Sequence, residues 1–564
     1  AKSATSAAIS RSVVFNAAYR GFTPGHLRWM LASDYYGPWQ PLSWLSYAVD
    51  HAFWGLAAPA FRRPNLVLHA AAAALAALCA RRLLDAALAA RVPERARALG
   101  ALAAALFFAL HPLRVESVVW ITERRDVLSG ALLLASLLAR LDGRRLLAPA
   151  LFAGALLAKG TAVALPFFLL AVEAYPLRHI PADPRRWAQA GARAVLRGLA
   201  PYFALAAAAG VMNLSLLGGE SLPAPVLGLG AALAAAAHGA GFYCLKTLWP
   251  SGLSPYYGLP RDWFAAAPRL AAHAALAAAV TVAAWAGRRR APWALAAWLA
   301  YLAALAPVSS LFQSGAQLAA DRYSYLPCLP FAFLVGGAAA VLAARRPRAA
   351  AGLVSLLAVF LALATARQSG FWRDDIRLWS RAVAVEPDAY LPRSNLAAAL
   401  LAAGEGEAAA PHLEAAVRIE PRDASARVNL GTVLAKRGDF AGAERLMREA
   451  LSLRPGDSAA AVNLAGLRAR AGDVKSASRL LEGVVARDPA FAAARFNLGI
   501  LLLRRGRKDD GLAQLREAVR LDSSLARNPS ERKAPRRSSR TAPPHPIFLR
   551  WPLWLSPPRR HSSP

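Results

Sequence analysis

Residues 111–126 read HPLRVESVVWITERRD and place six charged side chains between two strongly apolar runs. ALGALAAALFFAL precedes this stretch and VLSGALLLASLLA follows it. Ionisable groups beside a membrane span are costly to place and usually mark a pathway or a site. We therefore predict a helical membrane protein with a charged platform at the membrane surface. Its charged residues are Arg114, Glu116, Glu123, Arg124, Arg125 and Asp126.

The composition supports a polytopic membrane protein. Hydrophobic residues make up 56% of the 564 residues, which is high for a soluble domain. The net charge of +33 comes largely from Arg clusters between apolar runs, at 81–97, 144–145, 178–197, 288–290 and 345–348. Clusters of this kind mark cytoplasmic loops, so we expect a membrane partner and no nucleic acid. The three scattered cysteines provide neither a disulfide framework nor a metal-binding spacing.

Ten apolar stretches are interpreted as spans, although several fall short of the roughly 20 residues that a crossing helix needs. With the Arg clusters on the cytoplasmic side, the spans alternate only if a further stretch, 224–247, lies along the outer interface or re-enters. Residues 1–63, 111–126, 307–326 and everything after 367 then face outward. Because no span precedes 1–63, we expect either a missing N-terminal helix or a chain that begins part-way through its gene. The ten stretches are 64–82, 97–111, 127–141, 146–158, 161–175, 198–217, 267–286, 291–306, 327–344 and 349–366.

A period of 34 residues begins after about residue 370. Asn-Leu recurs at Asn395, Asn429, Asn463 and Asn497, and Gly and Pro positions repeat at the same interval. This spacing is the tetratricopeptide signature, in which stacked helix pairs share one core and expose a groove. We predict an all-α fold with four domains: an outward interfacial segment 1–63, a polytopic domain 64–366, a repeat domain 367–525 and a disordered basic tail 526–564. The alternative is that the end of the gene is translated out of frame, so that the tail is not the natural sequence.

Three outward segments supply candidate functional groups. In one helix, Glu116, Glu123 and Asp126 would share a face, and Arg114, Arg124 and Arg125 would match a phosphate. The alternative is a loop whose charges pair internally. The segment 13–63 adds Asp34, Asp50, His26 and Arg28 among interfacial aromatics, with local pairing of Asp50 as its alternative.

The remaining candidates lie near other span ends. Asp321 and Arg322 precede the span 327–344, where a local ion pair is the simpler interpretation. Lys159 would meet a lipid phosphate or extend to the interface without a role. The sequence contains no Gly-rich phosphate loop, Ser-His-Asp spacing or paired Cys motif. We therefore assign no residue to a metal site and expect no required cofactor. Whether the reaction uses a divalent metal from solution is left open.

Several ordered motifs resemble a known family. HPLRVESVVWITERRDVLSG, WQPLSWLSYAVDHAFWG, LLAKGTAVALPF, YCLKTLWP, ADRYSYLP and FWRDDIRLW, followed by the repeats, are similar to the transmembrane and tetratricopeptide repeat-containing proteins and their bacterial relatives. These belong to the GT-C superfamily of membrane glycosyltransferases. The resemblance covers about residues 12–522 and implies a GT-C-like fold for the membrane domain.

The resemblance implies sugar transfer with inversion from a polyprenyl- or dolichyl-phosphate carrier to an acceptor hydroxyl, such as Ser or Thr of a protein. A carboxylate would act as general base and cations would stabilise the departing lipid phosphate. We assign Glu116, Asp126 and Asp321 to catalysis, and His111, Arg114, Arg124, Lys159 and Arg322 to the lipid phosphate. The acidic pair that the family carries after its first span has no counterpart in AKSATSAAIS, residues 1–10.

Two other functions stay open. A membrane-anchored scaffold would bind a protein partner through the repeats without catalysis. A transporter would carry charges inside its spans, whereas most charges here lie at span ends. The short loops and the Ala- and Arg-rich composition favour a bacterial inner membrane, with the repeats on the extracytoplasmic side; in a eukaryote the equivalent is the endoplasmic reticulum membrane.

Overall fold

The computed structural model describes residues 16–33, 35, 39–56, 58–181, 183–216, 228–260, 263–312 and 317–526. The predicted all-α fold is confirmed for this part of the chain. Within it, only two short antiparallel strands interrupt the helices, β1 Tyr257–Gly258 and β2 Gln317–Ala319. The chain divides into two compact units, 1–385 and 386–564. The lead-in segment 367–385, which we assigned to the repeat domain, lies in the first unit.

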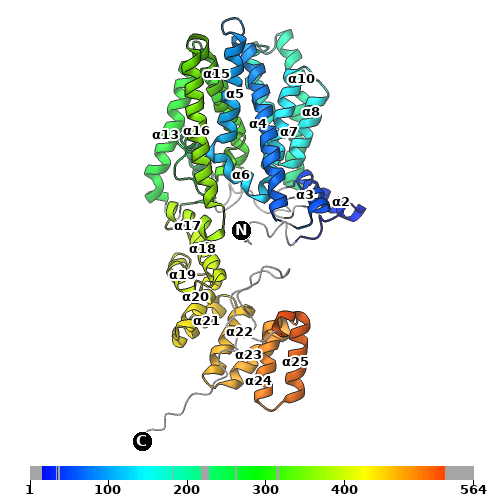
Figure 1. Ribbon diagram of the computed structural model, residues 1–564, viewed down its shortest axis with the longest axis vertical. Helices are drawn as coiled ribbons and strands as arrows, with labels where there is room; N and C mark the ends of the chain where they lie inside the picture. The colour runs from blue at the N-terminus through cyan, green and yellow to red at the C-terminus, as the bar shows by residue number, and fades with distance from the viewer. Residues whose placement is uncertain are drawn as a thin grey trace. The chain divides into compact units, whose positions relative to one another are not determined.

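The long helices of the first unit run side by side, and α2, α3 and α6 lie at one end of them (Figure 1). Each of the ten predicted apolar stretches overlaps a helix. The helices are α2 Pro24–Ala32, α3 Pro41–Trp54, α4 Ala58–Leu88, α5 Glu94–Leu110, α6 Val115–Val119, α7 Arg124–Leu141, α8 Leu147–Ala158, α9 Leu165–Ala174, α10 Ala190–Leu216, α12 Leu229–Leu248, α13 Trp263–Ala286, α14 Pro292–Leu305, α15 Leu329–Arg345, α16 Pro347–Phe371 and α17 Asp375–Val385. Short 3-10 turns join them, namely η1 Pro112–Arg114, η2 Ile121–Glu123, η3 Gly160–Ala164, η4 Pro184–Arg186, η5 Ala306–Val308 and η6 Asp321–Ser324.

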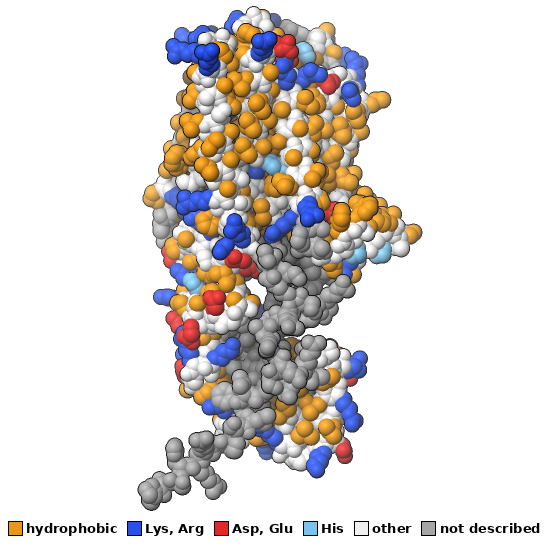
Figure 2. Space-filling view, viewed as in Figure 1, with side chains coloured by type: hydrophobic (Ala, Val, Ile, Leu, Met, Phe, Trp, Pro, Cys, Tyr) orange, Lys and Arg blue, Asp and Glu red, His pale blue; other side chains and the backbone are white. Residues whose placement is uncertain are grey.

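Four helices are long and apolar enough to cross a membrane: Phe61–Leu88, Ala190–Asn213, Ala266–Ala286 and Pro347–Phe371. A fifth candidate is the bent pair formed by Glu94–Leu110 and Pro112–Val119. Figure 2 shows hydrophobic side chains covering the middle of these helices on one face, with Lys and Arg at both ends. This distribution is the one expected of a helical bundle in a bilayer.

The stretch 224–247 forms α12 from Leu229 onward, and α12 is not among the candidate spans. It packs against α13 and α14 through a buried aromatic cluster that includes Phe242, Tyr243 and Tyr301. The Tyr301 hydroxyl donates a 2.5 Å hydrogen bond to the Ala240 carbonyl. Helix α12 is therefore tied into the bundle along its C-terminal half.

Helices α12 and α13 approach so closely at Gly241 that a Cβ atom there would lie 1.8 Å from the backbone oxygen of His273. Small residues permit such helix contacts in membrane proteins. We expect Gly241→Ala to destabilise the first unit by about 1–3 kcal/mol, since backbone cannot rotate away from the clash as a side chain can. Denaturation of the full chain in mixed micelles measures the change. Gly239→Ala is the matched control, because a Cβ at Gly239 meets nothing within 4 Å; equal effects of the two substitutions would contradict the prediction.

The second unit confirms the predicted 34-residue repeat as four helix pairs. Gly404, Gly438, Gly472 and Gly506 end the first helix of each pair or follow it, and each has a positive φ of 78–91°. The small residues that recur with the same period, Ala416, Ala450 and Ala518, are fully buried, as is Val484, which takes the third place in that series. The pairs are α18 Tyr390–Ala403 and α19 Gly406–Ile419, α20 Ala424–Arg437 and α21 Phe440–Leu453, α22 Ser458–Arg470 and α23 Val474–Arg487, and α24 Ala492–Arg504 and α25 Lys508–Leu521, with the turn η7 Ser523–Ala526 after the last. The predicted tail 526–564 lies outside the described residues from 527 onward.

Candidate functional site

The stretch 111–126 does not form one helix. The backbone is extended at His111 and again at Trp120, so the chain passes through η1, α6 and η2 before α7 begins. The prediction that Glu116, Glu123 and Asp126 share a helix face is therefore wrong. Pro112 follows the first break, and a proline disfavours helical backbone in the residue before it.

The charged side chains of this stretch do not form an open platform, because they are buried inside the first unit, except for the partly buried Arg125. Glu116, Glu123 and Arg124 are 1%, 0% and 1% exposed. The same holds for the other site residues taken from the resemblance, His111, Arg114, Asp126, Lys159, Asp321 and Arg322, which are all buried. A buried charge is costly unless it is paired, so the partners of these groups decide what the site can do.

Three carboxylates and three cations form one continuous network, which we call the charged cluster. Arg322 connects two of the acids: its Nη1 lies 2.5 Å from Glu116 Oε1, and its Nε lies 3.4 Å from Glu123 Oε1. Glu123 also accepts bonds of 2.8 and 3.1 Å from Arg125. Lys159 lies between Glu123, at 3.5 Å, and Asp126, with which it forms a close ion pair. The members are Glu116, Glu123, Asp126, Arg125, Lys159 and Arg322, so the cluster is formally neutral.

The predicted roles of Lys159 change accordingly. Its ammonium does not extend to the interface, because it is buried and paired with two acids. Asp126 has a second contact, a 3.0 Å hydrogen bond donated by the Ser117 hydroxyl. Glu123, which we did not choose as a site residue, contacts three cations and is the centre of the cluster. Burial alone would raise its pKa, but Arg125, Lys159 and Arg322 hold the pKa of this carboxyl well below its usual range.

Arg124 connects α7 to the segment 13–63. Its guanidinium donates 2.7 Å bonds to Asp50 Oδ2 and to the Phe61 carbonyl, contacts Asn65, and lies over the Tyr47 ring. Asp50 therefore pairs with a residue 74 positions away. The alternative of local pairing is wrong. Burial raises the pKa of Asp50 more than Arg124 lowers it. His26 lies at the start of α2, hydrogen-bonded to Thr23, while Asp34 lies outside the described residues.

Arg114 and His111 hold the stretch against other loops. Arg114 donates to the carbonyl and hydroxyl oxygens of Ser324 at 2.9 and 2.8 Å and lies over the Tyr325 ring. His111 Nε2 lies 3.0 Å from the Thr247 carbonyl at the end of α12. Arg114, Arg124 and Arg125 thus contact groups of the chain itself, and they do not form the common phosphate clamp that we predicted.

Asp321 and Arg322 do not pair with each other, so the local ion pair expected there is wrong. Arg322 belongs to the charged cluster, whereas Asp321 accepts a 2.8 Å hydrogen bond from the Tyr257 hydroxyl. Asp321 forms no ion pair within the described part of the chain. Burial, together with the nearby Glu116 carboxylate, raises the pKa of Asp321 well above its usual range. A raised pKa makes Asp321 a candidate for proton exchange, and burial also raises the pKa of Glu116, to about 7.

We expect Asp321→Asn to stabilise the chain increasingly as the pH rises. The folded pKa of Asp321 lies above the unfolded one, so wild-type stability from this group is present below the unfolded pKa and is lost as the pH rises through the folded pKa. Asn remains neutral and still accepts from Tyr257. Above about pH 4 the gap between variant and wild type should grow by up to about 1.4 kcal/mol per pH unit. Unfolding in mixed micelles at pH 5 and pH 8 tests this; a gap that shrinks with pH would contradict it.

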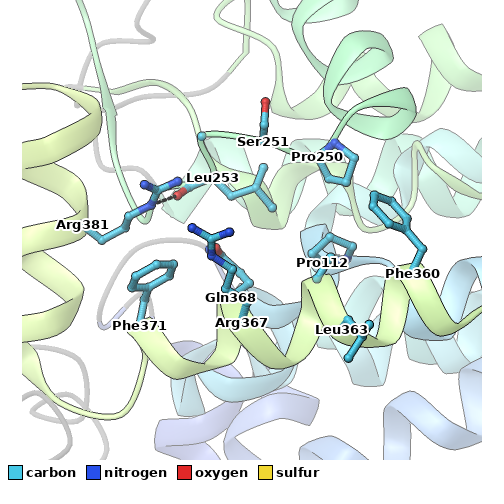
Figure 3. A pocket seen from close by; sticks show the side chains of 12 residues that line it. Pro112, Pro250, Ser251, Leu253, Phe360, Leu363, Arg367, Gln368, Phe371 and Arg381 are labelled. Atoms are coloured by element: carbon cyan, nitrogen blue, oxygen red, sulfur yellow. Dashed lines mark hydrogen bonds between the residues drawn. The ribbon is translucent and has the colours of Figure 1, made fainter.

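An open pocket of about 400 Å³ lies beside the charged stretch, within the first unit. Figure 3 shows how α16, α17 and the loop after α12 surround it. We did not predict this pocket from the sequence. Its lining residues are Pro112, Pro250, Ser251, Gly252, Leu253, Phe360, Leu363, Ala364, Arg367, Gln368, Phe371 and Arg381. Over the same described residues, no group of three or more His, Cys, Asp or Glu side chains is placed to hold a metal ion.

Comparison with known proteins concerns the second unit. Residues 400–464 and 434–490 match the family model described as Tetratricopeptide repeat. The second unit contains tetratricopeptide repeats. Stacked helix pairs of this kind leave a concave groove exposed, and such a groove suggests that the repeats bind a protein or peptide. No curated protein matches the chain.

Several solved structures are similar to parts of the chain. A crystal structure of MamA has 19% identity and a TM-score of 0.24, with 28% of this chain and 87% of that chain covered. MamA 41-end from Desulfovibrio magneticus RS-1 has 28% identity and a TM-score of 0.22, covering 24% and 76%. YrrB, described as a TPR protein with an unusual peptide-binding site, has 21% identity and a TM-score of 0.24, covering 31% and 86%.

Proposed function

We propose that the chain is a membrane glycosyltransferase that takes a sugar from a polyprenyl- or dolichyl-phosphate carrier and presents its acceptor through the tetratricopeptide repeats. The observation that carries the proposal is the contact between segments that the family resemblance singled out separately. Lys159 and Arg322 join Glu116, Glu123 and Asp126 in one buried cluster. Ionisable groups gathered at the ends of apolar helices favour a functional site.

In the proposed reaction, the acceptor hydroxyl gives its proton to a carboxylate as its oxygen bonds to the sugar carbon. The bond between that carbon and the lipid phosphate oxygen breaks, with inversion, and the phosphate leaves with the bonding electrons. We assign proton uptake to the ionised form of Asp321, because a carboxylate with a raised pKa is a stronger base and Asp321 forms no ion pair in the described structure. Arg322, held in position by Glu116, would stabilise the leaving phosphate. We place the reaction on the extracytoplasmic side of a bacterial inner membrane.

The test is transfer from a radiolabelled polyprenyl-phosphate sugar by membranes that contain the full chain. We expect Glu116→Gln to lower transfer at least tenfold, because Arg322 then loses a charged partner and takes another position. Glu482→Gln is the control, since Glu482 is exposed on the repeats. Equal transfer by both variants, at equal protein levels, would dismiss Glu116.

A second candidate is an inactive membrane-anchored scaffold. The observation that favours it is the neutrality of the charged cluster, whose three acids and three cations satisfy one another. In that case the repeats carry the function by binding a protein segment, and the cluster only stabilises the first unit. A folded wild-type chain that transfers no sugar from any supplied carrier lipid would favour this candidate.

A further inference from the structure

We infer that the pocket beside α16 binds an anionic phospholipid of the surrounding bilayer. This site is separate from the proposed sugar transfer, because its lining contains no carboxylate, histidine or lysine that could exchange a proton with a ligand. The ligand would be bound and not transformed. The inference depends on the lining residues and on the way one face of α16 changes character.

One stripe of α16 forms the floor of the pocket. Its residues follow the helical spacing from Phe360 to Phe371, at positions 360, 363, 364, 367, 368 and 371. The first part of the stripe is apolar, and Phe360 and Leu363 are 48% and 67% exposed. The second part is polar, with Arg367 and Gln368. Only 11% of the apolar segment of this candidate span is buried inside the protein. Bilayer hydrocarbon would therefore reach the apolar end of the pocket.

The polar end holds donors that lack partners within the chain. Gln368 is 6% exposed, yet its amide forms no hydrogen bond with any described residue, and the Arg367 guanidinium likewise forms no ion pair there. The Gln368 side chain lines the pocket, where its amide is available to donate to the oxygens of a ligand. Figure 3 shows Arg367, Gln368 and Arg381 together at one end of the pocket, with Pro112, Pro250 and Phe360 at the other.

The second cation is held in place. Arg381 Nε donates a 3.1 Å bond to the Leu253 carbonyl, and the guanidinium lies 5.0 Å from the centre of the Phe371 ring. The Arg381 side chain lies at the same end of the pocket as Arg367 (Figure 3). The loop it contacts is fixed in turn by Lys246, whose ammonium lies 2.5 Å from the Ser251 carbonyl. Two guanidinium groups and one amide match the oxygens of a phosphate diester.

The size of the pocket and its change from an apolar to a polar end together indicate an amphiphilic ligand. A volume of about 400 Å³ accommodates a phosphate headgroup and the first part of a chain, and is within the usual range of ligand pockets. The phosphate would lie between Arg367 and Arg381, and the chain would follow Phe360 and Leu363 into the bilayer. A bilayer phospholipid satisfies this arrangement without any further protein partner.

The test uses the purified full chain in detergent and native mass spectrometry with added phosphatidylglycerol. We expect Arg367→Ala and Gln368→Leu each to lower the retained phosphatidylglycerol at least fivefold. Arg348→Ala is the matched control, because Arg348 is an exposed arginine at the other end of α16, and it should retain the lipid as wild type does. Equal retention by Arg367→Ala and Arg348→Ala would overturn the inference.

Three competitors identify the source of the phosphate. Phosphatidylcholine should displace little, because its headgroup has no net charge, and inorganic phosphate should not displace the lipid at equal concentration. Equal competition by inorganic phosphate would overturn the requirement for a chain. Stronger binding of polyprenyl monophosphate than of phosphatidylglycerol would overturn the assignment to a bilayer phospholipid. Unfolding midpoints of the variants in the same detergent, if unchanged, show that lost binding is not lost folding.

Discussion

Arg322→Ala is expected to destabilise the first unit by about 3–5 kcal/mol, the range found when one partner of a buried ion pair is removed. Arg322 is 8% exposed and lies between Glu116 and Glu123. Its loss leaves two neighbouring buried carboxylates without the cation that they share. Glu123 keeps Arg125 and Lys159, whereas Glu116 loses its ion-pair partner. Unfolding of the full chain in mixed micelles measures the effect.

The control for this prediction is an arginine of the same unit in an exposed pair. Arg377 lies 3.5 Å from Asp374, and the two side chains are 57% and 39% exposed. Exposed pairs contribute at most about 1 kcal/mol, so Arg377→Ala should have a small effect. Arg322→Lys should fall between the two, because an ammonium keeps the charge but loses the planar fork that contacts both acids. Arg322→Ala and Arg377→Ala with the same effect would contradict the assigned role of the cluster.

The repeats could be predicted from the sequence because their information is local. Each of the four repeat glycines with positive φ lies at the turn inside a helix pair, and a small core residue recurs every 34 positions except at Val484. The same is true of the apolar helices of the first unit, whose positions follow from composition alone. Neither result required knowledge of contacts between distant parts of the chain.

The charged cluster depends on such distant contacts. The sequence shows that Glu116 and Arg322 are both charged. It does not show that the fold brings these two residues, 206 positions apart, into contact. It likewise cannot show that Asp50 satisfies Arg124. Burial of these groups therefore could not be predicted, and the surface platform was the natural interpretation of their charge. The sequence bears on topology only through the positions of Arg clusters between spans, so the outward side of these segments stays a prediction.

The pocket was missed for a different reason. Arg367 and Gln368 follow a strongly apolar helix, where polar residues are expected merely to mark its end. The change from Phe360 and Leu363 to Arg367 and Gln368 along one helix face is visible in the sequence. What the sequence does not show is the loop 250–253 opposite that face, which turns the face into a pocket.

Lys159→Met is expected to destabilise the first unit by about 3 kcal/mol, because Asp126 then keeps only the hydrogen bond from Ser117. Methionine fills a similar volume, so a cavity does not account for the loss. Adding Asp126→Asn should restore at least half of the stability, since Asn is neutral and still accepts from the Ser117 hydroxyl. A double variant no more stable than Lys159→Met would contradict the assigned Lys159–Asp126 pair.

The same double variant separates structure from catalysis. If Asp126 and Lys159 only neutralise each other, the variant that regains stability should regain sugar transfer with it, because Glu123 keeps Arg125 and Arg322. If either group acts on the lipid-linked sugar, stability returns while transfer stays at the level of Lys159→Met. Measuring unfolding and transfer on the same preparations distinguishes the two, since under a merely structural role transfer should return together with the stability that the double variant regains.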